Sequence, residues 1–150
     1  MTATVREARP GDASAIVGLI RALAEFEHLP GPTDEAAARF VEHGFGARPH
    51  FETLVAEDAG EIVAYAIFLT TYSTFLVRPS LFLEDIFVHP RARRRGVATA
   101  LMTRLRALAV ERGCGRFEWM VLDWNAGAQA LYRKLGATQL DAWRLCRVEL

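Results

Sequence analysis

A short basic segment holds the residues whose types and spacing most clearly suggest a chemistry. Residues 88–99 read Val-His-Pro-Arg-Ala-Arg-Arg-Arg-Gly-Val-Ala-Thr. A predicted strand ends there and a predicted helix begins, with Gly96 and Ala98 where larger side chains would crowd the backbone. A helix N-terminus leaves about four N–H groups unpaired and carries roughly half a positive charge, which suits a diphosphate. Taken alone, the cluster also fits a solvated basic turn or a nucleic-acid patch.

Two adjacent carboxylates precede this segment. Glu84 and Asp85 lie between the apolar stretches Leu81–Leu83 and Ile86–Val88. Alternation along a strand predicts that their side chains point to opposite faces of the sheet. At least one of them is then directed towards the interior or a cleft, where a carboxylate needs a partner. A structural role, in which the carboxylate caps a loop or pairs with an arginine, is common for such residues.

The N-terminal half is expected to supply one strand, two helices and a hairpin. Val5–Ala8 reads as a strand, and apolar residues at helical spacing predict a helix from Asp12 to about Glu27. Thr33-Asp34 can cap a second helix after the break at 30–32. Residues 51–58 and 61–71, joined at Gly60, read as an antiparallel hairpin.

The C-terminal half alternates strands and helices. The strand 81–88 is followed by a helix with Leu101, Met102, Leu105 and Leu108 on one face. A strand is expected over 117–122, then a helix capped by Asn125 and ended by Gly136, and a last strand over 143–149. The predicted order is β-α-α-β-β-β-α-β-α-β, a mixed α/β fold in a single domain of residues 1–150.

Composition narrows the class of protein. The 150 residues are 51% hydrophobic and 24% charged, and 18 basic residues balance 18 acidic ones. A zero net charge gives no general reason to expect nucleic acid or an anionic membrane as the partner. The polar start and the absence of a ~20-residue apolar run predict a cytoplasmic protein without a signal peptide or membrane span. The four histidines and two cysteines show no metal-ligand spacing, so no metal is expected.

The motifs together resemble a known family. Arg93-x-x-Gly96-x-Ala98 matches the R/Q-x-x-G-x-G/A loop of the GNAT acetyltransferases, between the strand and the helix that the family uses. Further segments resemble its diamine (spermidine/spermine) and thialysine N-acetyltransferase branch, in family order over nearly the whole chain. They are residues 23–27, 44–46, 54–57, 83–88, 124–125 and 143–145.

The resemblance implies a fold and an acetyl-CoA site. The fold is a central, mixed but mostly antiparallel, splayed sheet flanked by helices. The strand before the loop leaves its neighbour and offers backbone hydrogen bonds to the pantetheine arm. The residues implied in acetyl-CoA binding are Ile86, Phe87, Val88, Arg93, Arg94, Arg95, Gly96, Val97, Ala98, Thr99, Asn125 and Ala128.

The resemblance also implies the catalytic groups and an acceptor. Acetyl transfer needs a neutral amine and a protonated leaving thiolate, whereas a primary ammonium with a pKa near ~10.4 is almost fully charged at neutral pH. Tyr132 resembles the proton donor to the thiolate, and Glu84 the residue that contacts the amine and relays its proton. Phe26, Glu27, Glu84, Asp85 and Asp141 correspond to the amine-binding residues of the diamine branch.

The leading hypothesis is therefore direct transfer, in a ternary complex, from acetyl-CoA to a primary amine of a small cationic molecule such as a polyamine, a diamine or a thialysine-like amino acid. The branch also implies a homodimer. Alternatives are a protein or peptide N-acetyltransferase, and a regulatory domain that binds acetyl-CoA without catalysis. Retention of both Glu84 and Tyr132 argues against the second alternative.

Overall fold

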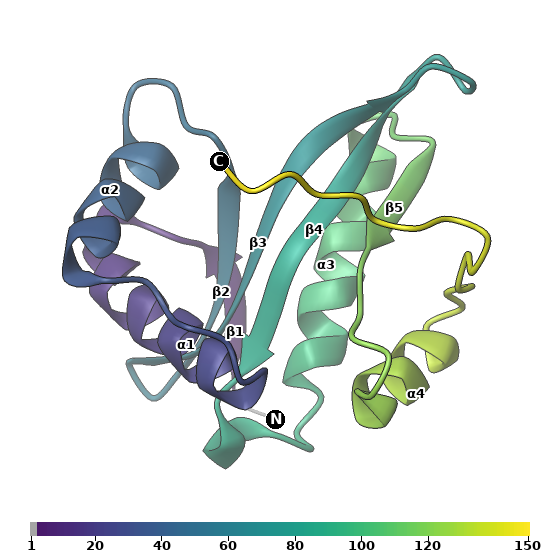
Figure 1. The fold of residues 1–150 in the computed structure, drawn as a ribbon. Helices are drawn as coiled ribbons and strands as arrows, with labels where there is room; N and C mark the ends of the chain where they lie inside the picture. Colours follow the sequence, from purple (N-terminus) through teal and green to yellow (C-terminus); the bar gives the residue numbers. More distant parts are fainter. Residues whose placement is uncertain (1–2) are drawn as a thin grey trace. The chain divides into compact units, whose positions relative to one another are not determined.

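The computed structural model describes residues 3–150, which form two compact parts divided after Met120 (Figure 1). The first part contains β1 (Thr4–Glu7), α1 (Ala13–Phe26), α2 (Asp34–Phe45), β2 (Glu52–Asp58), β3 (Glu61–Ser73), β4 (Arg78–Val88), α3 (Val97–Glu111) and β5 (Arg116–Trp119). Short 3-10 helices at Pro10–Asp12 and Pro90–Ala92 precede α1 and α3. Over residues 3–150, no helix is long and apolar enough to cross a membrane.

The second part, Val121–Leu150, contains α4 (Ala126–Lys134). Asn125 caps this helix as expected, because its side chain accepts a hydrogen bond from the Ala128 N–H at 3.2 Å. The strand predicted over 143–149 is wrong: residues 137–150 form no strand. A strand requires a neighbouring strand for its backbone hydrogen bonds, and this part of the chain contains no other. The strand predicted over 117–122 is shorter and ends at Trp119.

The sheet of the first part has five strands in the order β1-β2-β3-β4-β5. Three of the pairings are antiparallel, and β4 with β5 is parallel. This confirms the expected mixed, mostly antiparallel sheet. β4 pairs with β3 from Arg78 to Val88, but with β5 only from Ser80 to Leu83. The last residues of β4, Ile86–Val88, therefore have a strand partner on one side only.

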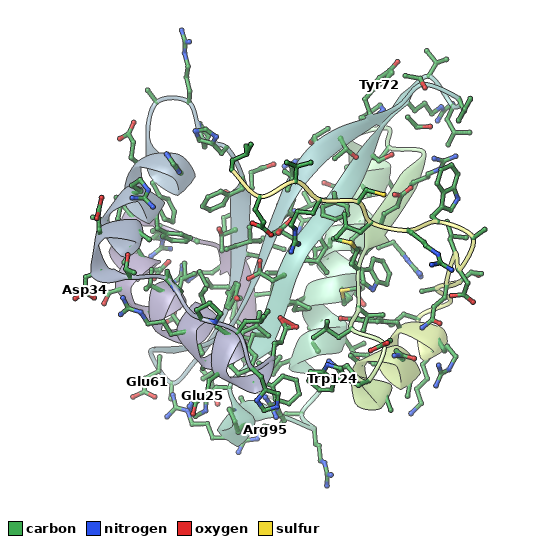
Figure 2. All side chains as sticks on the ribbon, viewed as in Figure 1. Glu25, Asp34, Glu61, Tyr72, Arg95 and Trp124 are labelled. Atoms are coloured by element: carbon green, nitrogen blue, oxygen red, sulfur yellow. The ribbon has the colours of Figure 1, made fainter. Side chains whose placement is uncertain are left out.

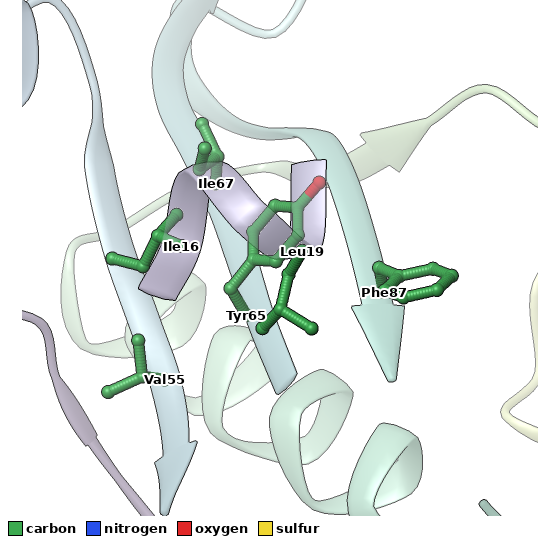
Figure 3. Packing of buried hydrophobic residues seen from close by; sticks show 6 residues of the cluster. All are labelled: Ile16, Leu19, Val55, Tyr65, Ile67 and Phe87. Atoms are coloured by element: carbon green, nitrogen blue, oxygen red, sulfur yellow. The ribbon is translucent and has the colours of Figure 1, made fainter. Parts of the chain in front are cut away.

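The core lies on both faces of this sheet. On one face, Ile16 and Leu19 of α1 pack against a cluster from three strands (Figure 3), namely Val55, Tyr65, Ile67 and Phe87. The intervening residues of β3 point to the other face, where the guanidinium of Arg112, next to the end of α3, lies 5.7 Å from the centroid of the Phe68 ring. The sheet is thus held from both sides, and the α1 face carries the groups described next.

Candidate functional site

A β-bulge interrupts the β3–β4 ladder at the two carboxylates. Asp85 pairs with Ile67, whereas Leu83 pairs with the next residue of β3, Phe68, so Glu84 has no partner on β3. Two residues of one strand then oppose one residue of the other. The strict alternation expected for Glu84 and Asp85 does not hold, because the extra residue brings Asp85 onto the face of Ile67. The bulge begins where the pairing with β5 ends, at Leu83.

The carboxylate of Asp85 is held by a phenol from the core. Tyr65 is fully buried, and its hydroxyl donates a short hydrogen bond to Oδ2 of Asp85. The phenol is in the right place because Tyr65 pairs with Phe87 on β4, two residues beyond Asp85 on the same face. Burial raises the pKa of Tyr65, and the neighbouring carboxylates of Asp85 and Glu27 raise it further. Tyr65 therefore acts as a hydrogen-bond donor.

Three carboxylates act on one another here, and no counterion for them lies among residues 3–150. Burial raises the pKa of Asp85 to about 6; the Tyr65 hydrogen bond lowers it, while the charges of Glu84 and Glu27 raise it. No arginine, lysine or histidine of residues 3–150 forms an ion pair with any of the three. Glu27, Glu84 and Asp85 thus form an acidic cluster, which is named the carboxylate cluster below.

Glu27 is placed by the way α1 ends. The helix closes with a Schellman motif: the His28 N–H donates to the Glu25 carbonyl at 3.1 Å, and the Leu29 N–H to the Ala24 carbonyl at 2.8 Å. His28 adopts the left-handed conformation, with φ of 58°, which is strained for a residue other than glycine. This turn fixes Glu27 at the C-cap position.

Arg93 connects the end of α1 to the end of β4. Its guanidinium lies 5.6 Å from the centroid of the Phe26 ring and 5.3 Å from that of Phe87, within the range of cation–π attraction. Its Nε donates to the Val88 carbonyl at 3.0 Å. The Arg93 side chain therefore contacts other residues of the chain. One of these contacts is Phe26, which the resemblance implies in amine binding.

Two of the other loop arginines are paired with carboxylates around the β2–β3 turn. Arg95 forms an ion pair with Asp58 at 3.4 Å, and Arg91 a closer one with Glu61. These four side chains line a pocket of about 220 Å³ beside the loop. Arg94 takes part in none of the ion pairs of residues 3–150, and its φ is 60°.

The N-terminus of α3 is open. Gly96 precedes the helix in the left-handed conformation, with φ of 76°, and no heavy atom lies within 4 Å of where its Cβ would be. The first hydrogen bond of the helix runs from the Ala100 N–H to the Gly96 carbonyl. The N–H groups of residues 97–99 have no acceptor within the described part of the chain. These N–H groups and the unpaired edge of Ile86–Val88 fit the diphosphate and the pantetheine arm of the expected ligand.

The remaining predicted residues belong to the second part of the chain. Asn125 and Ala128 form the N-terminal cap of α4, and Tyr132 lies in its last turn. The Tyr132 carbonyl accepts from the Ala137 N–H at 3.0 Å, which helps to close the helix. Asp141 lies in a turn after α4. Nowhere in residues 3–150 do three or more His, Cys, Asp or Glu side chains group in a way that could hold a metal ion.

Tyr65 was not among the residues selected from the sequence. A tyrosine inside the apolar stretch 62–69 reads as a packing residue, and its link to Asp85 depends on the register of β3 with β4. The only available signal was that a buried tyrosine hydroxyl usually needs a partner.

Several known proteins that this chain resembles in sequence or in fold are acetyltransferases. The family model described as Acetyltransferase (GNAT) family matches residues 16–137. A thialysine N-epsilon-acetyltransferase of Sus scrofa is 36% identical over 97% of this chain and 91% of its own length. An L-ornithine N5-acetyltransferase of Arabidopsis thaliana is 35% identical over 67% of this chain and 45% of its own length. A solved aminoglycoside N-acetyltransferase in complex with CoA has a TM-score of 0.79 at 22% identity, covering 99% of this chain and 94% of its own.

The raised pKa of Asp85 predicts a pH-dependent effect of Asp85→Asn on stability. A native pKa of about 6 against an ordinary value of 3.8 means that wild type loses stability as pH rises from about 4 to about 6. The amide still accepts the Tyr65 hydrogen bond but does not titrate. The free energy of unfolding of Asp85→Asn relative to wild type should therefore rise by about 1–2 kcal/mol between pH 4 and pH 7, discounted for partial exposure.

Urea denaturation at several pH values measures this difference. Asp34→Asn is the matched control, because the Asp34 side chain is fully exposed and its ion pair with Arg21 lies at the surface. Its effect should stay within about 0.5 kcal/mol at every pH. If the difference between Asp85→Asn and wild type is the same at pH 4 and pH 7, the Asp85 pKa is not raised.

Proposed function

Because the chain belongs to the GNAT acetyltransferase family and is an acetyl-CoA-dependent N-acetyltransferase, we propose that its acceptor is a primary amine of a small cationic molecule. Polyamines, diamines and thialysine-like amino acids are the candidates. The observation that carries this proposal is the carboxylate cluster of Glu27, Glu84 and Asp85, which has no counterion among residues 3–150. A cation supplied by the substrate would complement these charges.

The relatives support the same class of acceptor. Thialysine and ornithine, the substrates in the names of two relatives, are amino acids with a primary amine on the side chain. At neutral pH each carries an ammonium group on its side chain and another at its α-carbon. A cluster of carboxylates suits a molecule with two ammonium groups better than it suits an alkylamine with a neutral tail, which carries only one.

In the proposed ternary complex, acetyl-CoA lies along β4 and the start of α3. Its pantetheine arm would pair with the free edge of Ile86–Val88, and its diphosphate would accept hydrogen bonds from the N–H groups of residues 97–99. Gly96 leaves room for this approach, and Arg94 supplies a positive charge. Arg95 already pairs with Asp58, so we assign it a smaller share of the attraction. Asn125 and Ala128 are proposed to contact the cofactor from α4.

Transfer is proposed to be direct. The carboxylate of Glu84, alone or through one water, takes a proton from the ammonium. The amine nitrogen then attacks the thioester carbonyl, the C–S bond breaks, and Tyr132 protonates the leaving thiolate. The second proton that the nitrogen loses as it becomes an amide restores the Tyr132 phenol. Asp85, Glu27 and Asp141 hold the positive charges of the substrate. We further propose a homodimer, supported by the exposed apolar tip of the β3–β4 hairpin around Tyr72 and Phe75 (Figure 2).

Gly96→Glu should abolish stabilisation by acetyl-CoA. The variant places a side chain and a negative charge where the diphosphate is proposed to bind, and it strains a left-handed residue. Thermal unfolding with and without acetyl-CoA measures the effect. Gly113→Glu is the matched control, because Gly113 also has a positive φ of 70° and an open Cβ position, beyond the other end of α3. Equal shifts with acetyl-CoA in both variants would place the diphosphate elsewhere.

Glu84→Gln should raise KM for the amine and lower kcat by about 10²-fold or more, as for loss of a general base. The amide keeps the size of the side chain but neither attracts the ammonium nor takes its proton. Steady-state kinetics on spermidine, short diamines, thialysine and butylamine measure both constants. Glu35→Gln, at an exposed i,i+4 ion pair on α2, is the control and should behave as wild type. The cationic acceptor is excluded if butylamine has the highest kcat/KM and Glu84→Gln leaves the amine KM unchanged.

Tyr132→Phe should reduce kcat by about 10²–10⁴-fold, because the leaving thiolate loses its proton donor. The affinity for acetyl-CoA should change little, since the variant removes one hydroxyl. Single-turnover kinetics with saturating acetyl-CoA separate the two effects. Turnover close to that of wild type would show that Tyr132 is a packing residue.

A further inference from the structure

The hydroxyl of Tyr65 is not needed for packing. The Tyr65 ring is enclosed by Ile16, Leu19, Val55, Ile67 and Phe87, and all of these side chains are apolar (Figure 3). A phenylalanine would fill the same space without a polar atom to satisfy. Taking a hydroxyl out of water is unfavourable unless it finds a partner, and its hydrogen bond goes to Oδ2 of Asp85. The role of the phenol is therefore to be found in its effect on Asp85.

The Tyr65 hydroxyl fixes the orientation of the Asp85 carboxylate. Oδ2 of Asp85 receives the Tyr65 hydrogen bond, whereas Oδ1 receives no hydrogen bond from residues 3–150. Oδ1 is also not sealed in the core, since no buried side-chain oxygen or nitrogen of the described residues lacks a partner. Asp85 therefore has one oxygen attached to the core and one that is not sealed in it, and the charges of Glu84 and Glu27 act on this carboxylate.

We propose that Tyr65 is a positioning residue for the amine site: its hydroxyl holds Asp85 so that the second carboxylate oxygen receives the ammonium group of the acceptor. The inference rests on the proposed function, because it requires the carboxylate cluster to bind a cation. It assigns the role to a core residue that does not itself touch the substrate. Without this hydrogen bond the Asp85 side chain, next to the bulge, could turn, and Tyr65 removes that freedom.

Removal of the hydroxyl should therefore change the KM for the amine and not the KM for acetyl-CoA. In Tyr65→Phe we expect KM for the diamine to rise roughly tenfold, in keeping with loss of a hydrogen bond to a charged group. The acetyl-CoA KM should stay within about twofold of wild type. The phenol donates to the charged carboxylate, so without it Asp85 takes up a proton at higher pH. The acidic limb of kcat/KM for the amine should move to higher pH by about half a unit or more.

The groups that face Asp85 are few. They are Tyr65 on β3, Glu84 on β4 and Glu27 at the end of α1, and the Arg93 guanidinium lies against the neighbouring rings of Phe26 and Phe87. Tyr65→Phe leaves the other three unchanged. A shift of the acidic limb in this variant therefore reports on the bond between Tyr65 and Asp85.

Two further variants make the test specific. Thr70→Val removes a hydroxyl from the same strand at an exposed position, and it should match wild type in both KM values and in the pH profile. The double variant Tyr65→Phe/Asp85→Asn should have the same amine KM as Asp85→Asn alone, because Tyr65 acts only through Asp85.

The outcomes separate the two proposals. If wild type acetylates diamines and Tyr65→Phe has an unchanged amine KM and acidic limb, the positioning role is overturned and the proposed function stands. If Tyr65→Phe has a lower melting temperature, equal losses of kcat/KM for the amine and for acetyl-CoA, and no shift of the acidic limb, Tyr65 has a packing role. That outcome also overturns the positioning role. A wild type that acetylates no cationic amine overturns the proposed acceptor, and this inference with it.

Discussion

Between Leu83 and Asp85, β4 carries one residue more than β3 can oppose, and the arrangement of the site depends on that insertion. Before the bulge, β4 is an interior strand bonded to both β3 and β5; after it, β4 is bonded to β3 alone. At the bulge, the edge of β4 that faces away from β3 becomes available to a ligand. Beyond the bulge, Asp85 lies on the α1 face of the sheet. A regular ladder would instead pair Glu84 with β3 and keep the alternation of side chains through Leu83, Glu84 and Asp85.

One side chain, that of Arg93, links the end of α1 to the end of β4, and both ends border the site. Arg93 begins the glycine-containing loop, yet its guanidinium lies within cation–π range of the Phe26 and Phe87 rings and its Nε donates to the Val88 carbonyl. Lysine could not replace these contacts, because only the planar guanidinium stacks on rings while donating sideways. The position of Glu27, next to Phe26, thus depends on a residue whose sequence motif suggests only phosphate binding.

Much of the fold could be predicted from the sequence. Helical periodicity and cap residues gave α1, α2, α3 and α4 to within a few residues, and the apolar runs gave β2, β3 and β4. The bulge could not be predicted, because Glu84-Asp85 in an apolar run is equally compatible with regular alternation. The roles of Tyr65 and Arg93 depend on strand register and on contacts distant in sequence, which periodicity does not encode. A strand was also expected over 143–149, but pairing with another strand decides whether such a segment becomes one.

The carboxylate cluster has no counterion in the described part of the chain, and this has a consequence for turnover under the proposed function. An acetylated nitrogen is an amide and carries no charge at neutral pH, so the product has one positive charge fewer than the substrate. The attraction to Glu27, Glu84 and Asp85 that brings the substrate in therefore weakens when the new bond forms. Three like charges left close together repel one another, and the empty site again favours a fresh cation over the product that has just left. Product inhibition by the acetylated amine should accordingly be weak.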